Sequence, residues 1–314
     1  MKNNTLYVVV PCYNEEEVLG ETSKRLNEKL TALMEQKLIS EKSRVLFVND
    51  GSKDKTWEII KNLNKQNSMF CGITLSRNRG HQAALVAGLE TANKYADMTI
   101  SMDADLQDDI NAIDEMVKEY LNGYDVVYGV RSSRKKDTKF KKGTAEAFYK
   151  IMKKMGIDTV FNHADYRLLS KTALDGVLQF TEKNLFLRGI VPQVGFKSTT
   201  VEYERGERFA GESKYPLKKM LNFAIDGITS FSIKPLFLIL TLGIVFCMLG
   251  FVSFVTTLVL MFTIHLSSLW VILSFITLMV GIILGCLGLV GIYVGKTYIE
   301  TKQRPRYIIE EELK

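Results

Sequence analysis

A long uncharged stretch near the C-terminus constrains this chain more than any other feature. Residues 235–295 contain no Asp, Glu, Lys or Arg, and only the polar tip at 263–268 interrupts their apolar character. A helix needs roughly 20 apolar residues to cross the hydrocarbon core of a bilayer. The stretch therefore predicts two transmembrane helices, over residues 236–262 and 269–294. The alternative is a buried hairpin inside a large soluble protein.

Basic residues flank this stretch on both sides, whereas its middle loop carries no Lys or Arg. Because cationic flanks favour the cytosolic side, both termini are expected in the cytosol and the chain is expected to be a multi-pass plasma-membrane protein. The apolar run at 6–10 is too short for the core of a signal peptide. The flanking cations are Lys214, Lys218, Lys219 and Lys234 before the stretch, and Lys296, Lys302, Arg304 and Arg306 after it.

Short β-branched runs alternate with amphipathic stretches of helical period up to residue 129. This alternation predicts an α/β fold with a mainly parallel sheet and helices on both of its faces. The expected strands are 6–10, 45–48, 73–75, 99–102 and 126–129, and the expected helices are 15–36, 55–63, 81–92 and 110–121.

The four cysteines have neither the spacing of a zinc site nor that of a disulfide framework, so reduced thiols are expected.

The net charge of +6 indicates a weak attraction to anionic lipid or to phosphate-bearing substrates, and no nucleic-acid partner is needed to explain it. A basic run over residues 131–142 is typical of a solvated loop; contact with anionic lipid or a product phosphate is the alternative.

Polar segments follow four of the predicted strands. They are residues 11–15, 49–52, 76–81 and 103–108. In open parallel sheets, ligands bind beyond the carboxyl ends of the strands. One polar strand end is ordinary for a loop, but four at the same edge indicate a shared crevice.

Asp103 and Asp105 stand where the fourth strand ends, close enough to share one divalent cation. Mg²⁺ and Mn²⁺ prefer oxygen ligands and commonly keep water while bridging phosphates. Two carboxylates so close would repel each other without a cation, and Gln107 can add a neutral oxygen. The alternative is capping, since Asp is favoured at helix N-termini and Asp108 or Asp109 can serve there.

Four strings carry a resemblance to a known family: Val-Pro-Cys-Tyr-Asn-Glu-Glu at 10–16, Val-Asn-Asp-Gly-Ser-Lys-Asp at 48–54, Ser-Arg-Asn-Arg-Gly-His at 76–81 and Met-Asp-Ala-Asp-Leu-Gln-Asp at 102–108. The chain resembles the family-2 glycosyltransferases, which have the GT-A (nucleotide-diphospho-sugar transferase) fold. More narrowly, it is similar to the polyprenyl-phosphate glycosyltransferases, which include bactoprenol glucosyltransferases and dolichyl-phosphate mannose synthases. The resemblance extends over essentially the whole chain.

The resemblance implies roles for individual residues. Asp105 and Gln107 match ligands of the metal and diphosphate, with Asp103 beside the ribose and the metal, and the catalytic residues would be Asp105 and Asp165. The positions that match nucleotide-binding residues are Pro11, Tyr13, Glu15, Asp50, Arg77 and Asp103.

Two later segments resemble acceptor-side motifs of the same family. In residues 162–169, Asp165 would face the reacting phosphate, as a base or as an orienting group, with Arg167 following on the strand. An ordinary ion pair between these two residues is the alternative. Residues 205–215 are similar to the family's Arg…Gly-Glu-Ser-Lys-Tyr segment. The residues expected to contact the acceptor phosphate are Arg167, Arg205, Arg208, Ser213, Lys214 and Tyr215.

The expected organisation is a catalytic domain over 1–212, an amphipathic juxtamembrane segment over 213–234, the membrane helices within 235–295 and a cytosolic tail over 296–314. The resemblance implies inverting, metal-dependent transfer of a hexose, glucose or N-acetylhexosamine, from a UDP-linked donor to undecaprenyl phosphate at the bilayer. A GDP-mannose donor and a non-lipid acceptor are the alternatives, and a homo-oligomer is left open. A dinucleotide-binding oxidoreductase would want Gly-x-Gly-x-x-Gly after the first strand, where this chain has Pro-Cys-Tyr-Asn-Glu.

Overall fold

The computed structural model describes residues 4–132, 163–182, 187–204, 206 and 269–314, with the isolated positions 241, 245, 248 and 252. The chain divides into two compact units. One consists of Met1–Ala224 together with Pro305–Lys314, and the other is Ile225–Arg304. The predicted juxtamembrane segment at 213–234 lies outside the described residues.

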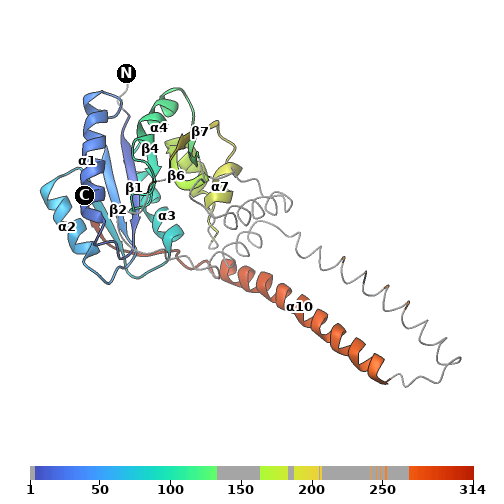
Figure 1. The fold of residues 1–314 in the computed structure, drawn as a ribbon. Helices are drawn as coiled ribbons and strands as arrows, with labels where there is room; N and C mark the ends of the chain where they lie inside the picture. Colours follow the sequence, from blue (N-terminus) through green and yellow to red (C-terminus); the bar gives the residue numbers. More distant parts are fainter. Residues whose placement is uncertain are drawn as a thin grey trace. The chain divides into compact units, whose positions relative to one another are not determined.

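The first unit is built on one mixed sheet (Figure 1). Its strands are β1 (Leu6–Cys12), β2 (Arg44–Asn49), β3 (Phe70–Leu75), β4 (Met98–Ser101), β5 (Val126–Arg131), β6 (His163–Ser170), β7 (Ser198–Tyr203) and β8 (Ile309–Leu313). They lie in the order β7-β5-β6-β4-β1-β2-β3-β8. Strands β4, β1, β2 and β3 are parallel, so their carboxyl ends meet at one edge of the sheet.

Helices cover both faces of this sheet (Figure 1). They are α1 (Leu19–Glu35), α2 (Thr56–Gln66), α3 (His81–Ala92), α4 (Ala112–Leu121), α6 (Lys171–Leu178) and α7 (Leu187–Gln193). Alternate residues of a strand point to opposite faces. Val8 and Val10 therefore join the core beneath α1, α2 and α4, whereas Val9 faces α3.

The five predicted strands and four predicted helices are present, with ends shifted by a few residues. The expectation of a mainly parallel sheet is corrected to a mixed one. Strand β6 runs antiparallel to both β4 and β5, and β8 runs antiparallel to β3. Hydrophobic alternation shows that a strand exists but not its direction, so the sequence could not reveal these pairings.

The last strand brings the C-terminal residues back to the free edge of β3. Glu311 accepts a hydrogen bond from Trp57 Nε1 at 3.2 Å and pairs with Lys61 Nζ at 2.8 Å. Nearby, Arg306 donates to the carbonyl of Phe180, and the hydroxyl of Tyr307 donates to Glu90. An uncovered edge strand invites pairing with other chains, and β8 covers the edge of β3. We did not predict this strand from the sequence.

Helix α3 approaches β1 and β2 closely because Gly88 has no side chain. A Cβ atom at this position would lie 2.4 Å from Val9 Cγ1 and 2.6 Å from Val48 Cγ2. Gly88→Ala should therefore lower the free energy of unfolding by about 1–3 kcal/mol, measured by urea denaturation. In the control Gly20→Ala, nothing lies within 4 Å of the new Cβ, and stability should rise by about 0.5–1 kcal/mol. An unchanged midpoint for Gly88→Ala would contradict this packing.

The second unit contains helix α10 (Leu269–Thr301). Within the described ranges of the chain, no helix has both the length and the apolar character that a membrane crossing requires. This finding contradicts the predicted two-helix membrane hairpin and the predicted multi-pass plasma-membrane location, and both are withdrawn. Of the predicted helix over 236–262, only positions 241, 245, 248 and 252 are described.

Candidate active site

The loops that follow β1 and β2 are joined by hydrogen bonds at the carboxyl edge of the sheet. The backbone N–H of Asn14 donates to Ser52 Oγ at 3.0 Å, and Asn14 Oδ1 accepts from the N–H of Lys53 at 2.9 Å. The N–H of Glu15 donates to Thr56 Oγ1 at 2.9 Å. Asn14 has a φ of 53°, a left-handed conformation that Asn tolerates better than most residues. This bonding fixes the loop in which Tyr13 is 38% exposed at the edge of the sheet.

Asp50 supports the loop between β3 and α3 from below. Its carboxylate is buried and accepts the backbone N–H groups of Arg79 at 2.7 Å and Gly80 at 2.9 Å. Burial raises the pKa of Asp50, although these two hydrogen bonds oppose the rise. The same loop passes over Gly51, where a Cβ would lie 2.6 Å from the backbone nitrogen of Asn78. The Asn-Asp-Gly-Ser string thus shapes the loop that presents Arg77, which is exposed.

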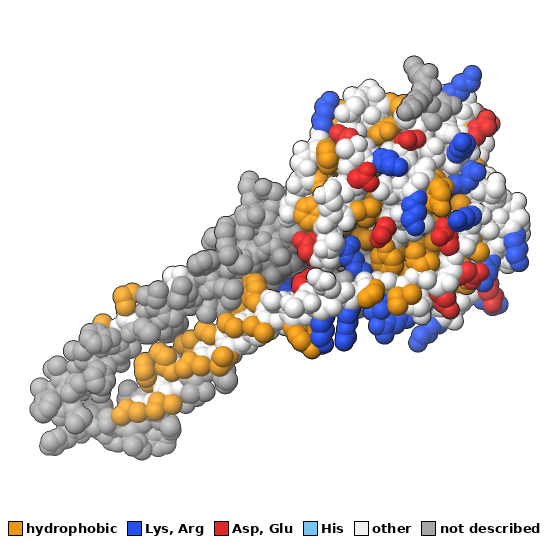
Figure 2. Space-filling view, turned by 180° about the vertical axis from the view of Figure 1, so that it is seen from behind, with side chains coloured by type: hydrophobic (Ala, Val, Ile, Leu, Met, Phe, Trp, Pro, Cys, Tyr) orange, Lys and Arg blue, Asp and Glu red, His pale blue; other side chains and the backbone are white. Residues whose placement is uncertain are grey.

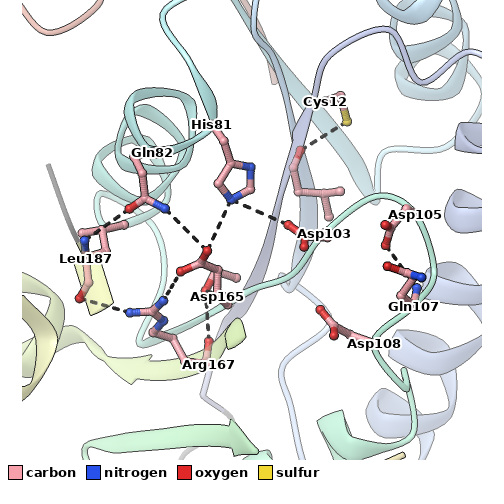
Figure 3. Close-up of polar contacts among 12 residues, drawn as sticks. Cys12, His81, Gln82, Asp103, Asp105, Gln107, Asp108, Asp165, Arg167 and Leu187 are labelled. Atoms are coloured by element: carbon pink, nitrogen blue, oxygen red, sulfur yellow. Dashed lines mark hydrogen bonds and ion pairs between the residues drawn. The ribbon is translucent and has the colours of Figure 1, made fainter. Parts of the chain in front are cut away.

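Two of the candidate metal ligands, Asp105 and Gln107, lie side by side on the loop after β4 (Figure 3). Asp105 Oδ1 accepts the backbone N–H of Gln107 at 3.2 Å. Between them Leu106 has a φ of 57°, which costs a residue with a Cβ about 1–2 kcal/mol. Such strained conformations persist where the surroundings fix them, often at functional sites. Asp103 begins this loop, and 42% of its side chain is exposed.

Three neighbouring strands hold the loop in this strained form. The hydroxyl of Tyr203, at the end of β7, donates to the buried Asp108 Oδ1 at 2.5 Å, and Arg131 Nη2 lies 3.6 Å from the same oxygen. Burial, and secondarily the charge of Asp103, raises the pKa of Asp108 to about 6. The hydroxyl of Tyr166, on β6, donates to the carbonyl of Asp109 at 3.0 Å. The loop is therefore rigidly supported beside its candidate ligands.

The donor set of this loop fits a hard divalent cation. It consists of oxygen atoms only, from Asp103, Asp105 and Gln107. No cluster of three or more His, Cys, Asp or Glu residues that could hold a metal occurs in the described part of the chain. Mg²⁺ does not require one, because it is usually bound by one or two carboxylates together with water and substrate phosphates.

Asp165, on β6, is surrounded by donors (Figure 3). Its Oδ1 lies 2.5 Å from Arg167 Nη2 and 3.2 Å from Arg188 Nε, and its Oδ2 lies 3.1 Å from Arg188 Nη2. Gln82 Nε2 donates to Oδ2 at 3.5 Å. Burial alone would raise the pKa of Asp165, but the charges of Arg188, Arg167 and His81 together hold it well below its usual range. A general base needs a pKa near the working pH, so Asp165 is better suited to orienting its neighbours.

His81 connects this cluster to the loop after β4. Its Nε2 lies 3.7 Å from Asp103 Oδ1 and 3.9 Å from Asp165 Oδ2 (Figure 3). Asp103 lies on the loop after β4, whereas Asp165 lies on β6, far away in the sequence. One imidazole at the start of α3 therefore lies between the candidate metal loop and the arginine cluster.

The structure thus gathers most of the predicted site residues at one edge of the sheet. Arg167, predicted to contact an acceptor phosphate, is 2% exposed and lies beneath Asp165. The other predicted acceptor residues lie outside the described residues: Arg205, Arg208, Ser213, Lys214 and Tyr215. Sequence reasoning missed three residues of the site. His81 ends the string at 76–81 and Gln82 follows it, so a local signal for these two residues was present. No local signal connects Arg188 with Asp165.

Comparisons with known proteins identify the family of the chain. Residues 7–178 match the family model described as Glycosyl transferase family 2. The chain is 48% identical to the uncharacterized glycosyltransferase YkoT of Bacillus subtilis, over 98% of this chain and 92% of the relative. It is 37% identical to the prophage bactoprenol glucosyl transferase homolog of Escherichia coli, over 96% and 97%. It is 36% identical to the bactoprenol glucosyl transferase of Shigella phage SfV, over 97% and 98%.

Among solved structures, the glucosyl-3-phosphoglycerate synthase of Mycobacterium tuberculosis is similar with a TM-score of 0.47 at 13% identity, over 72% of this chain and 78% of that one. The family match covers more than half of the chain, and the relatives match nearly all of it. The family resemblance of the strand-end strings is therefore confirmed. The chain is a glycosyltransferase and belongs to glycosyl transferase family 2.

Proposed function

We propose that this glycosyltransferase transfers a hexose, with glucose favoured, from a UDP-linked donor to a polyprenyl phosphate. One observation carries the proposal. The imidazole of His81 lies between the oxygen-rich loop that holds Asp103 and Asp105 and the two arginines that contact Asp165. The first feature suits a donor diphosphate with its cation, and the second suits an anionic acceptor. Two relatives named bactoprenol glucosyl transferase, or its homolog, support the sugar and the acceptor.

The donor would occupy the edge formed by the ends of β1, β2, β3 and β4. Exposed Tyr13 and Arg77 would contact the nucleotide directly. Pro11 is near the end of β1, and Glu15 lies in the loop that follows. Both carboxylate oxygens of Asp50 already accept backbone hydrogen bonds, so its contribution would include holding the Arg77 loop.

Asp103, Asp105 and Gln107 would hold Mg²⁺ or Mn²⁺ at the donor diphosphate. A cation bound there would offset the negative charge that develops on the leaving diphosphate. The support for Leu106 and Asp108 keeps these oxygens in place before the donor binds. Such preorganisation stabilises charge without a cost of rearrangement during the reaction.

The reaction would be a direct displacement. An oxygen of the acceptor phosphate attacks the anomeric carbon, a new carbon–oxygen bond forms, and the bond to the nucleotide diphosphate breaks with its electron pair. A phosphate monoester is already ionised near neutral pH, so no proton has to be removed. The low pKa of Asp165 agrees with an orienting role. Displacement inverts the anomeric centre, so an α-linked donor would give a β-linked product.

The charge pattern does not favour a nucleic-acid ligand for the same site. Lys and Arg number 41 against 35 Asp and Glu. Figure 2 shows basic and acidic side chains interspersed over one face of the α/β unit. Nucleic-acid sites usually show basic residues clustered on one face or along one helix. A nucleotide sugar and a lipid phosphate are therefore the anionic ligands that we propose.

The acceptor class can be tested with the purified full-length chain, Mg²⁺ and radiolabelled UDP-glucose. Polyprenyl phosphate and the matching polyprenol without phosphate are offered in the same detergent. We expect labelled lipid only with the phosphate, and a β-anomeric configuration by NMR. Equal transfer to the alcohol, or transfer to neither lipid, would refute the proposed acceptor.

A further inference from the structure

We propose that Arg188, rather than Arg167, binds the phosphate of the acceptor. This inference rests on the proposed function and names a residue that the sequence motifs did not indicate. Both arginines contact Asp165, but only 2% of the Arg167 side chain is exposed, against 29% of the Arg188 side chain. An incoming phosphate can reach a side chain at the surface of the crevice more readily than one beneath it.

Arg167 is enclosed by protein. Its Nη2 lies 2.5 Å from Asp165 Oδ1, and its Nη1 donates to the carbonyl of Leu187 at 3.3 Å. Its buried Nε has no hydrogen-bond partner within the described part of the chain. These contacts make Arg167 a support that fixes both Asp165 and the first residue of α7, which immediately precedes Arg188.

Asp165 holds Arg188 in a defined orientation. Asp165 Oδ1 accepts from Arg188 Nε at 3.2 Å, and Oδ2 accepts from Nη2 at 3.1 Å. The carboxylate therefore forms a bidentate pair with one edge of the guanidinium. A guanidinium has five N–H donors in a rigid plane, which suits recognition of a second anion such as phosphate. Two-point anchoring also limits the side-chain entropy that Arg188 would lose when phosphate binds.

Arg188 also lies close to the donor side of the site. Gln82, on α3, contacts Asp165 and the residue before Arg188: its Nε2 donates to Asp165 at 3.5 Å, and its Oε1 accepts the N–H of Leu187 at 3.2 Å. The neighbouring His81 connects Asp165 with Asp103 of the candidate metal loop. A phosphate on Arg188 would therefore lie across the sugar from the donor diphosphate, on the side from which its oxygen has to attack the anomeric carbon.

The test compares Arg188→Gln and Arg188→Lys with the wild-type full-length chain, using undecaprenyl phosphate in detergent and UDP-glucose. For Arg188→Gln, we expect the KM for the lipid phosphate to rise about 10- to 100-fold, the range for a lost hydrogen bond to a charged group. The KM for UDP-glucose should change less than about twofold. Arg188→Lys keeps the charge but loses the planar guanidinium. Its acceptor KM should therefore lie between those of the wild type and of Arg188→Gln.

A matched control is Arg25→Gln, which removes an exposed arginine that pairs with Glu21 on α1. It should leave both KM values unchanged. Binding of the phosphate is checked by the shift in the midpoint of thermal unfolding that citronellyl phosphate causes. Arg188→Gln should abolish this shift. If Arg188→Gln does not fold, the two KM values of Arg188→Lys decide whether Arg188 binds the acceptor. A rise confined to the acceptor KM supports the assignment, and an equal rise in both KM values contradicts it.

The outcomes separate this inference from the proposed function. If the wild-type chain makes no glycolipid, the proposed function fails, and this inference fails with it. If the wild type is active and Arg188→Gln keeps the wild-type acceptor KM, or raises both KM values equally, Arg188 does not bind the acceptor phosphate. A large rise confined to the acceptor KM supports the assignment.

Discussion

Asp105→Ala should reduce sugar transfer by about 1,000-fold, the loss expected when a group that stabilises developing charge is removed. Asp105 begins the strained turn at Leu106, and its Oδ1 accepts the N–H of Gln107. Its carboxylate is the candidate ligand through which a cation would reach the donor diphosphate. Initial rates measured over a range of Mg²⁺ and Mn²⁺ concentrations give the loss in rate and any change in metal dependence.

The matched control for this change is Asp109→Asn, four residues along the same loop. Asp109 Oδ1 accepts the N–H of Asn111 at 2.9 Å, a local contact before α4. This variant should keep activity within about threefold of wild type, since the amide oxygen of Asn can still accept the same N–H. Circular dichroism should show that both variants are folded. Wild-type rates in Asp105→Ala would rule out its role as a metal ligand.

Asp165→Asn should lower both activity and stability. The change keeps the shape of the side chain but leaves buried Arg167 and half-buried Arg188 without their carboxylate. Breaking a buried ion pair by removing one partner costs about 3–5 kcal/mol, which urea denaturation at pH 7 would measure. Transfer should fall by about 100-fold or more, because the arginines would no longer be held in place.

The stability loss should depend on pH. The pKa of Asp165 in the folded chain is below its unfolded value of about 3.9. The stabilisation is therefore fully present above about pH 4 and is lost as the pH falls further, so the gap between wild type and Asp165→Asn should narrow in acid. A gap that stays constant down to pH 2 would contradict the ion-pair assignment.

A double variant separates structure from function at this site. Adding Arg167→Met to Asp165→Asn removes the unpaired buried cation, whose uncompensated charge accounts for much of the cost of breaking a buried pair. The double variant should regain much of the lost stability but little of the lost activity. Recovery of activity together with stability would mean that Asp165 acts only through the fold.

The placement of the donor-side residues at strand ends could be predicted because its signals are local. The strings after β1 to β4 place Asn14, Asp50, Gly51, Asp103 and Asp105 at strand ends, and parallel strands bring these ends to one edge. The Asp-x-Asp string places Asp103 and Asp105 on the loop after β4, on either side of Ala104 and next to the turn at Leu106, and their role as metal ligands stays a prediction. The sequence could not predict that Asp50 holds the Arg77 loop, because this role depends on contacts with backbone groups of another loop.

The contacts around Asp165 could not be predicted because they are long-range. Arg167 follows Asp165 in the motif, yet the strand alternation and the packing of α7 bury it. Arg188 meets Asp165 only after β6 and α7 have packed together. The C-terminal strand β8 was missed for a similar reason, since a five-residue strand forms there only against the edge of β3.

The uncharged stretch shows another limit of sequence reasoning. Its composition predicted two membrane-crossing helices, and the described residues contain no helix that meets the requirements for a crossing. The proposed acceptor therefore rests on the arginine cluster and the relatives, not on this stretch.

The most direct test of the account is to incubate the purified full-length chain with undecaprenyl phosphate, Mg²⁺ or Mn²⁺, and a panel of nucleotide sugars. Mass spectrometry of the extracted lipids identifies any product. We predict a hexosyl phosphate lipid with UDP-glucose that disappears when the metal is chelated and when Asp105 is replaced by alanine. The absence of glycolipid with every donor in the panel would contradict the central claim.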